Sequence, residues 1–168
     1  RDEPFAVILA DDLLDGNPPV LKQMLKVYEE QNGSVLAVEK IDLAKSSSYG
    51  IVAGTEVTKG IHRLNSIVEK PQPKDAPSNL AVVGRYVLSS DIFQHIHNLK
   101  PGAGGEIQLT DAIASLLKED PVFAYEYDGV RYDCGSKLGY LKASVEFALR
   151  HPEVSKDFEA YLKGRSLI

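Results

Sequence analysis

The apolar residues of this chain group into segments typical of strands and of helices. The first segment, "FAVILADD" (Phe5 to Asp12), is a continuous apolar run that ends in two acids. Its length and its Val and Ile content predict a central strand that is covered on both faces, as in a parallel sheet. Such a strand needs partners on both edges, so we expect the chain to be a fragment that lacks the part preceding this strand.

The next segment has the spacing of an amphipathic helix. Its apolar residues fall on one helical face: Val20, Leu21, Met24, Leu25 and Tyr28. Pro19 suits the first turn of this helix, and Asn32 and Gly33 supply its end. The sequence therefore predicts a strand followed by a helix, which is the repeating unit of α/β folds.

The rest of the chain continues this alternation. We expect strands at 34–41, 81–89 and 122–134, the last with a turn at Asp128 and Gly129, and a hairpin turning at Lys59 and Gly60. Helices are expected at 89–99, 106–120, 137–150 and 155–163. The predicted fold class is α/β, with a mixed, mostly parallel, doubly wound (Rossmann-like) sheet. Residues 1–150 are expected to form one catalytic part, and residues 151–168 a C-terminal helix.

Composition narrows the function classes. Of the 168 residues, 43% are hydrophobic and 26% are charged, as in soluble globular proteins. The net charge of -5 and the lack of a basic run argue against a nucleic-acid partner. The single cysteine, Cys134, excludes an internal disulfide. No apolar stretch approaches the roughly 20 residues that span a bilayer, so we expect no membrane association and a cytoplasmic location.

Acidic residues follow two of the predicted strands. Asp11 and Asp12 end the first strand, and Asp133 ends a later one before Gly135. Ligands of open α/β sheets bind beyond the carboxyl ends of strands, where two carboxylates can hold one Mg²⁺ together with phosphate oxygens and water. Helix capping is an equally good interpretation of Asp11 and Asp12, and the commoner one for an aspartate before a helix, such as Asp133. A calcium loop that starts at Asp11 is excluded, because Leu13 would occupy its third position.

The stretch "SIVEKPQP" (66–73) places two opposite charges at a predicted strand end. Glu69 and Lys70 precede Pro71, and an extended bend at the prolines would turn both side chains into one cleft. A carboxylate accepts hydrogen bonds from sugar hydroxyls, and an ammonium group pairs with phosphate. On composition alone, a solvated ion pair is the favoured interpretation. Gly50 starts another strand, where a ligand can approach the backbone or a bulge can form.

Four segments together carry a family resemblance. In order, "YGIV", "VEKPQPKDAPSNLAVVGRYVL", "PGAGGEIQLTDAI" and "YDCGSKLGYLKASVEF" resemble the bacterial UTP–glucose-1-phosphate uridylyltransferases, from Phe5 to about Arg150. The resemblance implies the fold of nucleotide-diphospho-sugar transferases. It also implies an enzyme that converts UTP and glucose 1-phosphate into UDP-glucose and pyrophosphate with Mg²⁺, and that forms a homo-oligomer.

The resemblance assigns roles to individual residues. Glu69 matches a glutamate that binds glucose hydroxyls, Lys70 the lysine that holds the sugar phosphate, and Gly50 a glycine that contacts the sugar. Asp11 matches the acid of an "LPD" stretch in which Ala10 here replaces the proline, and Asp133 matches the acid of "DCG". The resemblance implies that these two acids hold the metal. Glu106 and Gln108 of "GEIQLTD" are also typical of the family, and a role at a helix N-terminus is expected for them.

One family feature has no counterpart in the sequence. The family opens with a glycine-rich G-x-G-T-R loop around the nucleotide phosphates, and no segment matches it. We therefore expect a truncated transferase that is inactive by itself. Alternatives are a related transferase for another nucleotide or sugar, and a non-catalytic module that binds a sugar nucleotide.

Overall fold

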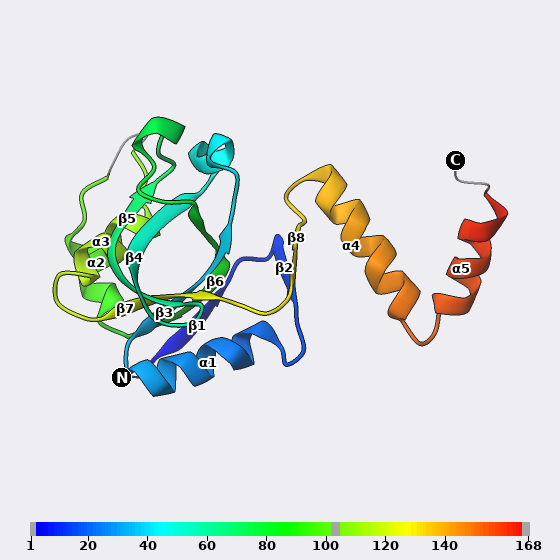
Figure 1. Ribbon diagram of the computed structural model, residues 1–168, viewed down its shortest axis with the longest axis horizontal. Coiled ribbons are helices and arrows are strands. Elements are labelled where there is room, and N and C mark those ends of the chain that lie inside the picture. Colours follow the sequence, from blue (N-terminus) through cyan, green and yellow to red (C-terminus); the bar gives the residue numbers. More distant parts are fainter. Residues whose placement is uncertain (1–2, 102–104, 166–168) are drawn as a thin grey trace.

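The computed structural model describes residues 3–101 and 105–165, and its main element is a mixed six-stranded sheet. The strand order is β1–β6–β3–β7–β5–β4. The first residues of β4 pair with β6 as well as with β5, so the strands from β6 to β4 form a closed ring of pairings (Figure 1). The bounds are β1 (Phe5–Ile8), β3 (Ser34–Lys40), β4 (Gly50–Thr58), β5 (Ile61–Glu69), β6 (Leu80–Leu88) and β7 (Val122–Glu126).

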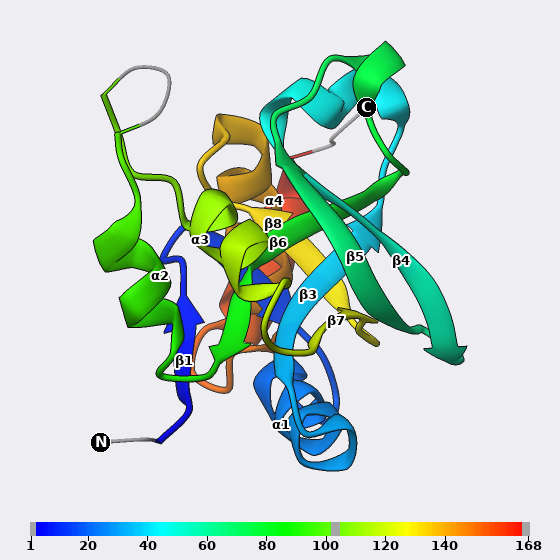
Figure 2. The ribbon, with the colours of Figure 1, turned by 90° about the vertical axis from the view of Figure 1, so that its left-hand side faces the viewer.

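Helices cover both faces of the sheet, as Figure 2 shows. Helix α1 (Val20–Gln31) packs on one face, and α2 (Ile92–Asn98) and α3 (Leu109–Leu116) pack on the other. Side chains of the central strand β3 alternate between the two cores: Leu36 and Val38 lie with α3, whereas Val35 and Ala37 lie with α1. This double covering explains why β3 is apolar from Val35 to Val38.

A small second sheet carries the C-terminal helices. Strands β2 (Asp12–Asp15) and β8 (Val130–Asp133) pair as a two-stranded antiparallel ribbon. The chain leaves this ribbon through α4 (Lys137–Arg150) and α5 (Ser155–Gly164), which extend away from the main sheet (Figure 1). Two short 3₁₀ turns, at Leu43–Ser48 and Pro73–Asp75, precede β4 and β6.

The α/β class, the mixed sheet and the order of the predicted elements are confirmed. The predicted predominance of parallel pairing is not found, because β3 with β7 is the one parallel pair among the described strands. The prediction of one buried strand from Phe5 to Asp12 is also wrong. The chain leaves β1 after Ile8 and enters the ribbon at Asp12, and β1 alternates between half-buried and exposed residues.

The predicted helix ends and turns agree with the structure in part. Asn32 ends α1 in the left-handed conformation, and Gly60 turns the β4–β5 hairpin with a φ of 75°. Asp91 occupies the N-cap position of α2. The segment 122–134 turns at Asp128 and Gly129 as predicted, and its two halves join different sheets, β7 the main sheet and β8 the ribbon. Within 3–101 and 105–165, no helix is long and apolar enough to cross a membrane.

The central strand supports both cores, and a truncation there is expected to be costly. Leu36→Ala removes a side chain with 0% exposure, so we expect the free energy of unfolding to fall by about 2 to 5 kcal/mol. Leu138→Ala, at a position that is 63% exposed on α4, is the matched control and should change it by less than about 0.5 kcal/mol. Urea denaturation measures both, and equal losses would contradict this assignment of the core.

Candidate functional site

Two carboxylates meet at the end of the β2–β8 ribbon. Asp12 lies opposite Asp133 in the antiparallel register, and the Cys134 amide donates to the Asp11 carbonyl at 2.7 Å. A Cβ placed on Gly135 would lie 3.0 Å from Asp11 Oδ2 and 3.2 Å from Asp133 Oδ1. Asp11 and Asp133 therefore face the same small space, which the missing side chain of Gly135 leaves open.

Asp12 is engaged with the protein itself. It is buried, and its Oδ1 accepts a hydrogen bond from Arg131 Nε at 2.5 Å, while its Oδ2 accepts one from the Gly84 amide at 2.8 Å. Burial alone would lower the pKa of Arg131, but the hydrogen bonds to Asp12 and Tyr49 and the nearby negative charges raise it above its ordinary value. In contrast to Asp12, the Asp11 side chain is exposed.

A second group of residues lies where β4 begins and β5 ends. Gly50 is paired with Glu69 across these two antiparallel strands. A Cβ on Gly50 would lie 2.9 Å from Thr110 Cγ2 and 3.5 Å from Glu69 Oε2, so a larger residue would crowd the wall of the site. The glycine thus keeps the space beside the Glu69 carboxylate open.

Lys70 adopts a conformation that the sequence did not indicate. Its φ is 45°, in the left-handed region, whereas an extended bend was expected before Pro71. This turn brings Lys70 Nζ to 3.3 Å from Glu69 Oε1, although neighbouring side chains on a strand point to opposite faces. The Lys70 amide donates to the Tyr49 carbonyl at 2.9 Å, so the backbone stays tied to the start of β4.

One cavity of about 310 Å³ joins the two groups. Asp11, Gly50, Glu69 and Asp133 all line it. Lys70 is not among the lining residues, and its exposed side chain contacts Glu69. The structure thus brings four of the five predicted site residues into one cavity, with the fifth in contact with one of them.

The same cavity contains residues that sequence reasoning missed. Tyr49, Tyr86, Thr110 and Arg131 all line it. Burial, followed by the charges of Glu69 and Asp12, raises the pKa of Tyr86 to about 12, so its phenol is neutral and able to donate a hydrogen bond at neutral pH. The available signal was position, because Tyr49 directly precedes Gly50 and Arg131 lies two residues before Asp133.

The motif "PGAGGEIQLTDAI" reaches the cavity through helix α3. Thr110 lies in the first turn of α3, and Gln108 occupies the N-cap position of that helix, as expected. Gln108 Nε2 lies 3.2 Å from an exposed Glu106 carboxylate oxygen. Residues 102–104 of this motif lie outside the described residues.

The acids fit a hard divalent cation such as Mg²⁺. Asp11 and Asp133 offer carboxylate oxygens, the ligands that Mg²⁺ prefers, to one open space. The described ranges contain no group of three or more His, Cys, Asp or Glu side chains arranged to hold a metal. A cation at this place would therefore take few protein ligands and complete its shell with water and phosphate oxygens, as Mg²⁺ does in phosphate-transferring enzymes.

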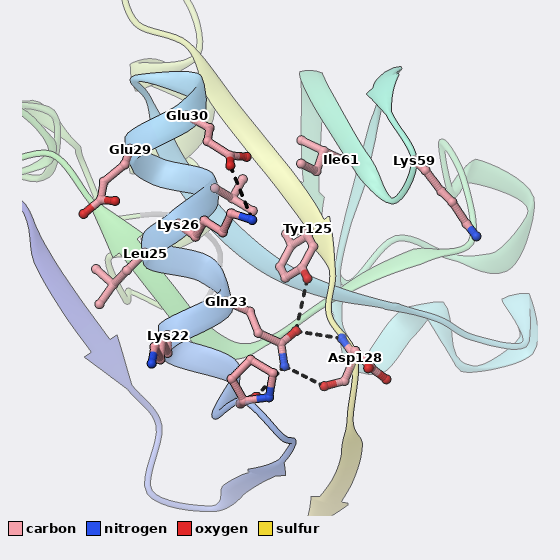
Figure 3. Close-up of a pocket in the computed structure, with 12 residues that line it drawn as sticks. Lys22, Gln23, Leu25, Lys26, Glu29, Glu30, Lys59, Ile61, Tyr125 and Asp128 are labelled. Carbon is pink, nitrogen blue, oxygen red and sulfur yellow. Dashed lines mark hydrogen bonds and ion pairs between the residues drawn. The ribbon is translucent and has the colours of Figure 1, made fainter.

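A larger hollow of about 760 Å³ lies between α1 and the strands β5 and β7. Its central polar side chain is Gln23, whose Nε2 donates to the carbonyls of Pro18 and Asp128 at 2.7 and 2.8 Å (Figure 3). Its Oε1 accepts hydrogen bonds from Tyr125 Oη and the Asp128 amide. These contacts use the hydrogen-bonding capacity of Gln23 within the protein, so we place the candidate site in the smaller, acid-lined cavity.

Comparison with known proteins finds close relatives of the chain. The chain is 47% identical over 166 residues to "UTP--glucose-1-phosphate uridylyltransferase 2" of Streptococcus pyogenes, which covers 96% of this chain and 56% of the relative. A solved UDP-glucose pyrophosphorylase in complex with UDP-glucose is 43% identical with a TM-score of 0.81, covering 98% of this chain and 58% of that protein. A UTP-bound enzyme from Acinetobacter baumannii is 41% identical, also with a TM-score of 0.81, covering 96% and 56%.

The matches cover nearly all of this chain but only part of each relative. The chain spans slightly more than half the length of the relatives it matches. The sequence model of the family described as "Nucleotidyl transferase" matches residues 1–149, which is most of the chain. On this evidence, the chain belongs to the nucleotidyl transferase family.

Proposed function

We propose that this chain supplies the sugar-phosphate and metal-binding part of an enzyme that transfers a uridylyl group from UTP to glucose 1-phosphate. The observation that carries the proposal is the one cavity that Asp11, Gly50, Glu69 and Asp133 line, with Lys70 in contact with Glu69. The names of the relatives, and the solved structures that hold UDP-glucose and UTP, support this choice of substrates.

The reaction needs alignment and charge neutralisation more than a protein nucleophile. A phosphate oxygen of glucose 1-phosphate attacks the α-phosphorus of UTP, and the bond to the leaving pyrophosphate breaks. Both reactants are polyanions, so the barrier falls when positive charge and fixed orientation are supplied. Mg²⁺ held by Asp11 and Asp133 would neutralise charge on the phosphate oxygens.

Glu69, Gly50 and Lys70 would bind the sugar and its phosphate. Glu69 accepts hydrogen bonds from sugar hydroxyls, and the open wall at Gly50 lets the sugar approach the backbone. Lys70 pairs with the sugar phosphate as a compact positive charge, for which it moves from its contact with Glu69. Its ammonium then holds the attacking phosphate in line with the nucleotide.

A hybrid enzyme tests the proposal directly. The part of the Streptococcus pyogenes relative that this chain does not cover is joined to residues 1–168. The hybrid is expected to release pyrophosphate from UTP and glucose 1-phosphate in the presence of Mg²⁺. Thymidine and guanosine triphosphates and other sugar phosphates form the comparison panel. Faster turnover with another pair would identify a different transferase, and no turnover with any pair would favour a non-catalytic module.

Lys70 should act on the sugar phosphate selectively. In the hybrid, Lys70→Met is expected to raise the KM for glucose 1-phosphate by roughly 10- to 100-fold, because a hydrogen bond to a charged group is lost. The KM for UTP should change much less. Lys59→Met, at the turn of the β4–β5 hairpin, is the matched control and should leave both values unchanged. An equal rise in both KM values for Lys70→Met would contradict the role given to Lys70.

The two metal acids should be needed together. Asp11→Asn and Asp133→Asn are each expected to lower Mg²⁺-dependent turnover by about 100-fold or more, since a bound metal supplies several kcal/mol of charge stabilisation. Asp15→Asn, on the same ribbon but paired with Arg150, controls for the loss of an acid there. Turnover is measured by pyrophosphate release over a range of Mg²⁺ concentrations. If either metal-acid variant kept the parent rate, that acid would not be a ligand.

A further inference from the structure

Arg131 lines the cavity and contacts both the ribbon beside the acids and the segment before Gly50. Its side chain is only 11% exposed, and it contacts groups from three other parts of the chain. Its Nε donates to Asp12 at 2.5 Å, and its Nη1 donates to Glu39 at 2.9 Å and to the Tyr49 hydroxyl at 3.2 Å. One guanidinium thus contacts the ribbon, the central strand β3 and the segment before β4.

The contact of Arg131 with Asp12 positions the two proposed metal acids, Asp11 and Asp133. Asp12 directly follows Asp11, and Arg131 itself lies on β8 two residues before Asp133. Arg131 therefore links β8 to the start of β2, next to both acids. Asp12 also accepts from the Gly84 amide on β6, which anchors the ribbon to the main sheet.

The contact of Arg131 with Tyr49 positions the segment that leads into β4. The guanidinium carbon lies 5.2 Å from the centre of the Tyr49 ring, so the side chain stacks on the ring as well as donating to its hydroxyl. Tyr49 directly precedes Gly50, and its carbonyl accepts from the Lys70 amide at 2.9 Å. The position of the tyrosine thus determines where both Gly50 and Lys70 lie.

The contact with Glu39 connects this cluster to the main sheet. Glu39 lies on β3, whose preceding residues are fully buried in the two cores. The chemistry of the side chain matters here, because a guanidinium presents several donors in a planar fork and stacks on aromatic rings. A lysine ammonium keeps the charge but offers neither the fork nor the flat face.

We propose that Arg131 is a positioning residue that holds the acid side of the site, Asp11 and Asp133, at a fixed place relative to the sugar side, Gly50 and Lys70. Its role in turnover rests on the proposed function, whereas the mechanical coupling of the two sides does not. The coupling is therefore tested first in the 168-residue chain, without substrate.

Amide hydrogen exchange reports each side separately. The Cys134 amide, bonded to the Asp11 carbonyl, reports the acid side, and the Lys70 amide reports the sugar side. We expect Arg131→Lys to speed exchange about tenfold at both amides, which corresponds to the loss of one hydrogen bond to a charged group. Tyr49→Phe, which removes the hydroxyl but keeps the ring, should speed exchange at Lys70 alone.

A matched arginine provides the control. Arg150 also pairs with an aspartate, Asp15, at 2.7 Å and also lies over an aromatic ring, that of Phe147, but it is exposed and on α4. Arg150→Lys should change neither reporter amide. Amides of β3 should keep their protection in all variants. Equal acceleration throughout the chain, or acceleration at one reporter only in Arg131→Lys, would overturn the proposed coupling.

The hybrid enzyme provides the functional readout. Arg131→Lys should raise both the KM for glucose 1-phosphate and the Mg²⁺ concentration for half-maximal rate by about tenfold, with a melting temperature close to the parent. Tyr49→Phe should raise the KM alone. If the parent hybrid did not turn over, the proposed function would fail while the exchange result still decided the coupling. A changed kcat with both constants unaltered would contradict a positioning role.

Discussion

The buried contact between Arg131 and Asp12 is the interaction on which the site depends. Asp133 ends β8 and Asp11 directly precedes β2, so both proposed metal acids depend on the β2–β8 ribbon, and an isolated pair of short strands is marginally stable in water. The ribbon is held because Asp12 bonds the Gly84 amide of β6, while Arg131 bonds Glu39 of β3. Desolvating two charges is costly, so this pair contributes placement more than net stability.

Much of the fold follows from local patterns. The helical spacing of α1, its left-handed end at Asn32 and the turn at Gly60 are each set by residues close in sequence. Pairing partners are not local. The apolar run from Phe5 contains no information about which strands lie beside it, and so its division into an edge strand and a ribbon strand could not be predicted. The same holds for β8, which leaves β7 to pair with β2.

Only part of the candidate site shows in local patterns. Asp133 and Glu69 end strands, Gly50 begins one and Asp11 directly precedes one, and the cavity brings these four residues together. Their roles were predicted from the family resemblance, because composition alone favoured a solvated ion pair for Glu69. Arg131 and Tyr49 were missed because their importance comes from contacts between distant segments. Sequence spacing also left Asp11 and Asp12 equivalent, whereas burial and hydrogen bonds separate an exposed carboxylate from one engaged within the protein.

The left-handed backbone at Lys70 has a consequence for how this position can vary. Residues with a side chain adopt such a conformation at a cost of order 1 kcal/mol or more, which glycine largely avoids. The backbone geometry at position 70 therefore suits glycine, whereas the proposed pairing with a sugar phosphate requires an ammonium group. Selection for thermal stability alone would favour glycine at this position, at the loss of the positive charge that the proposed function needs.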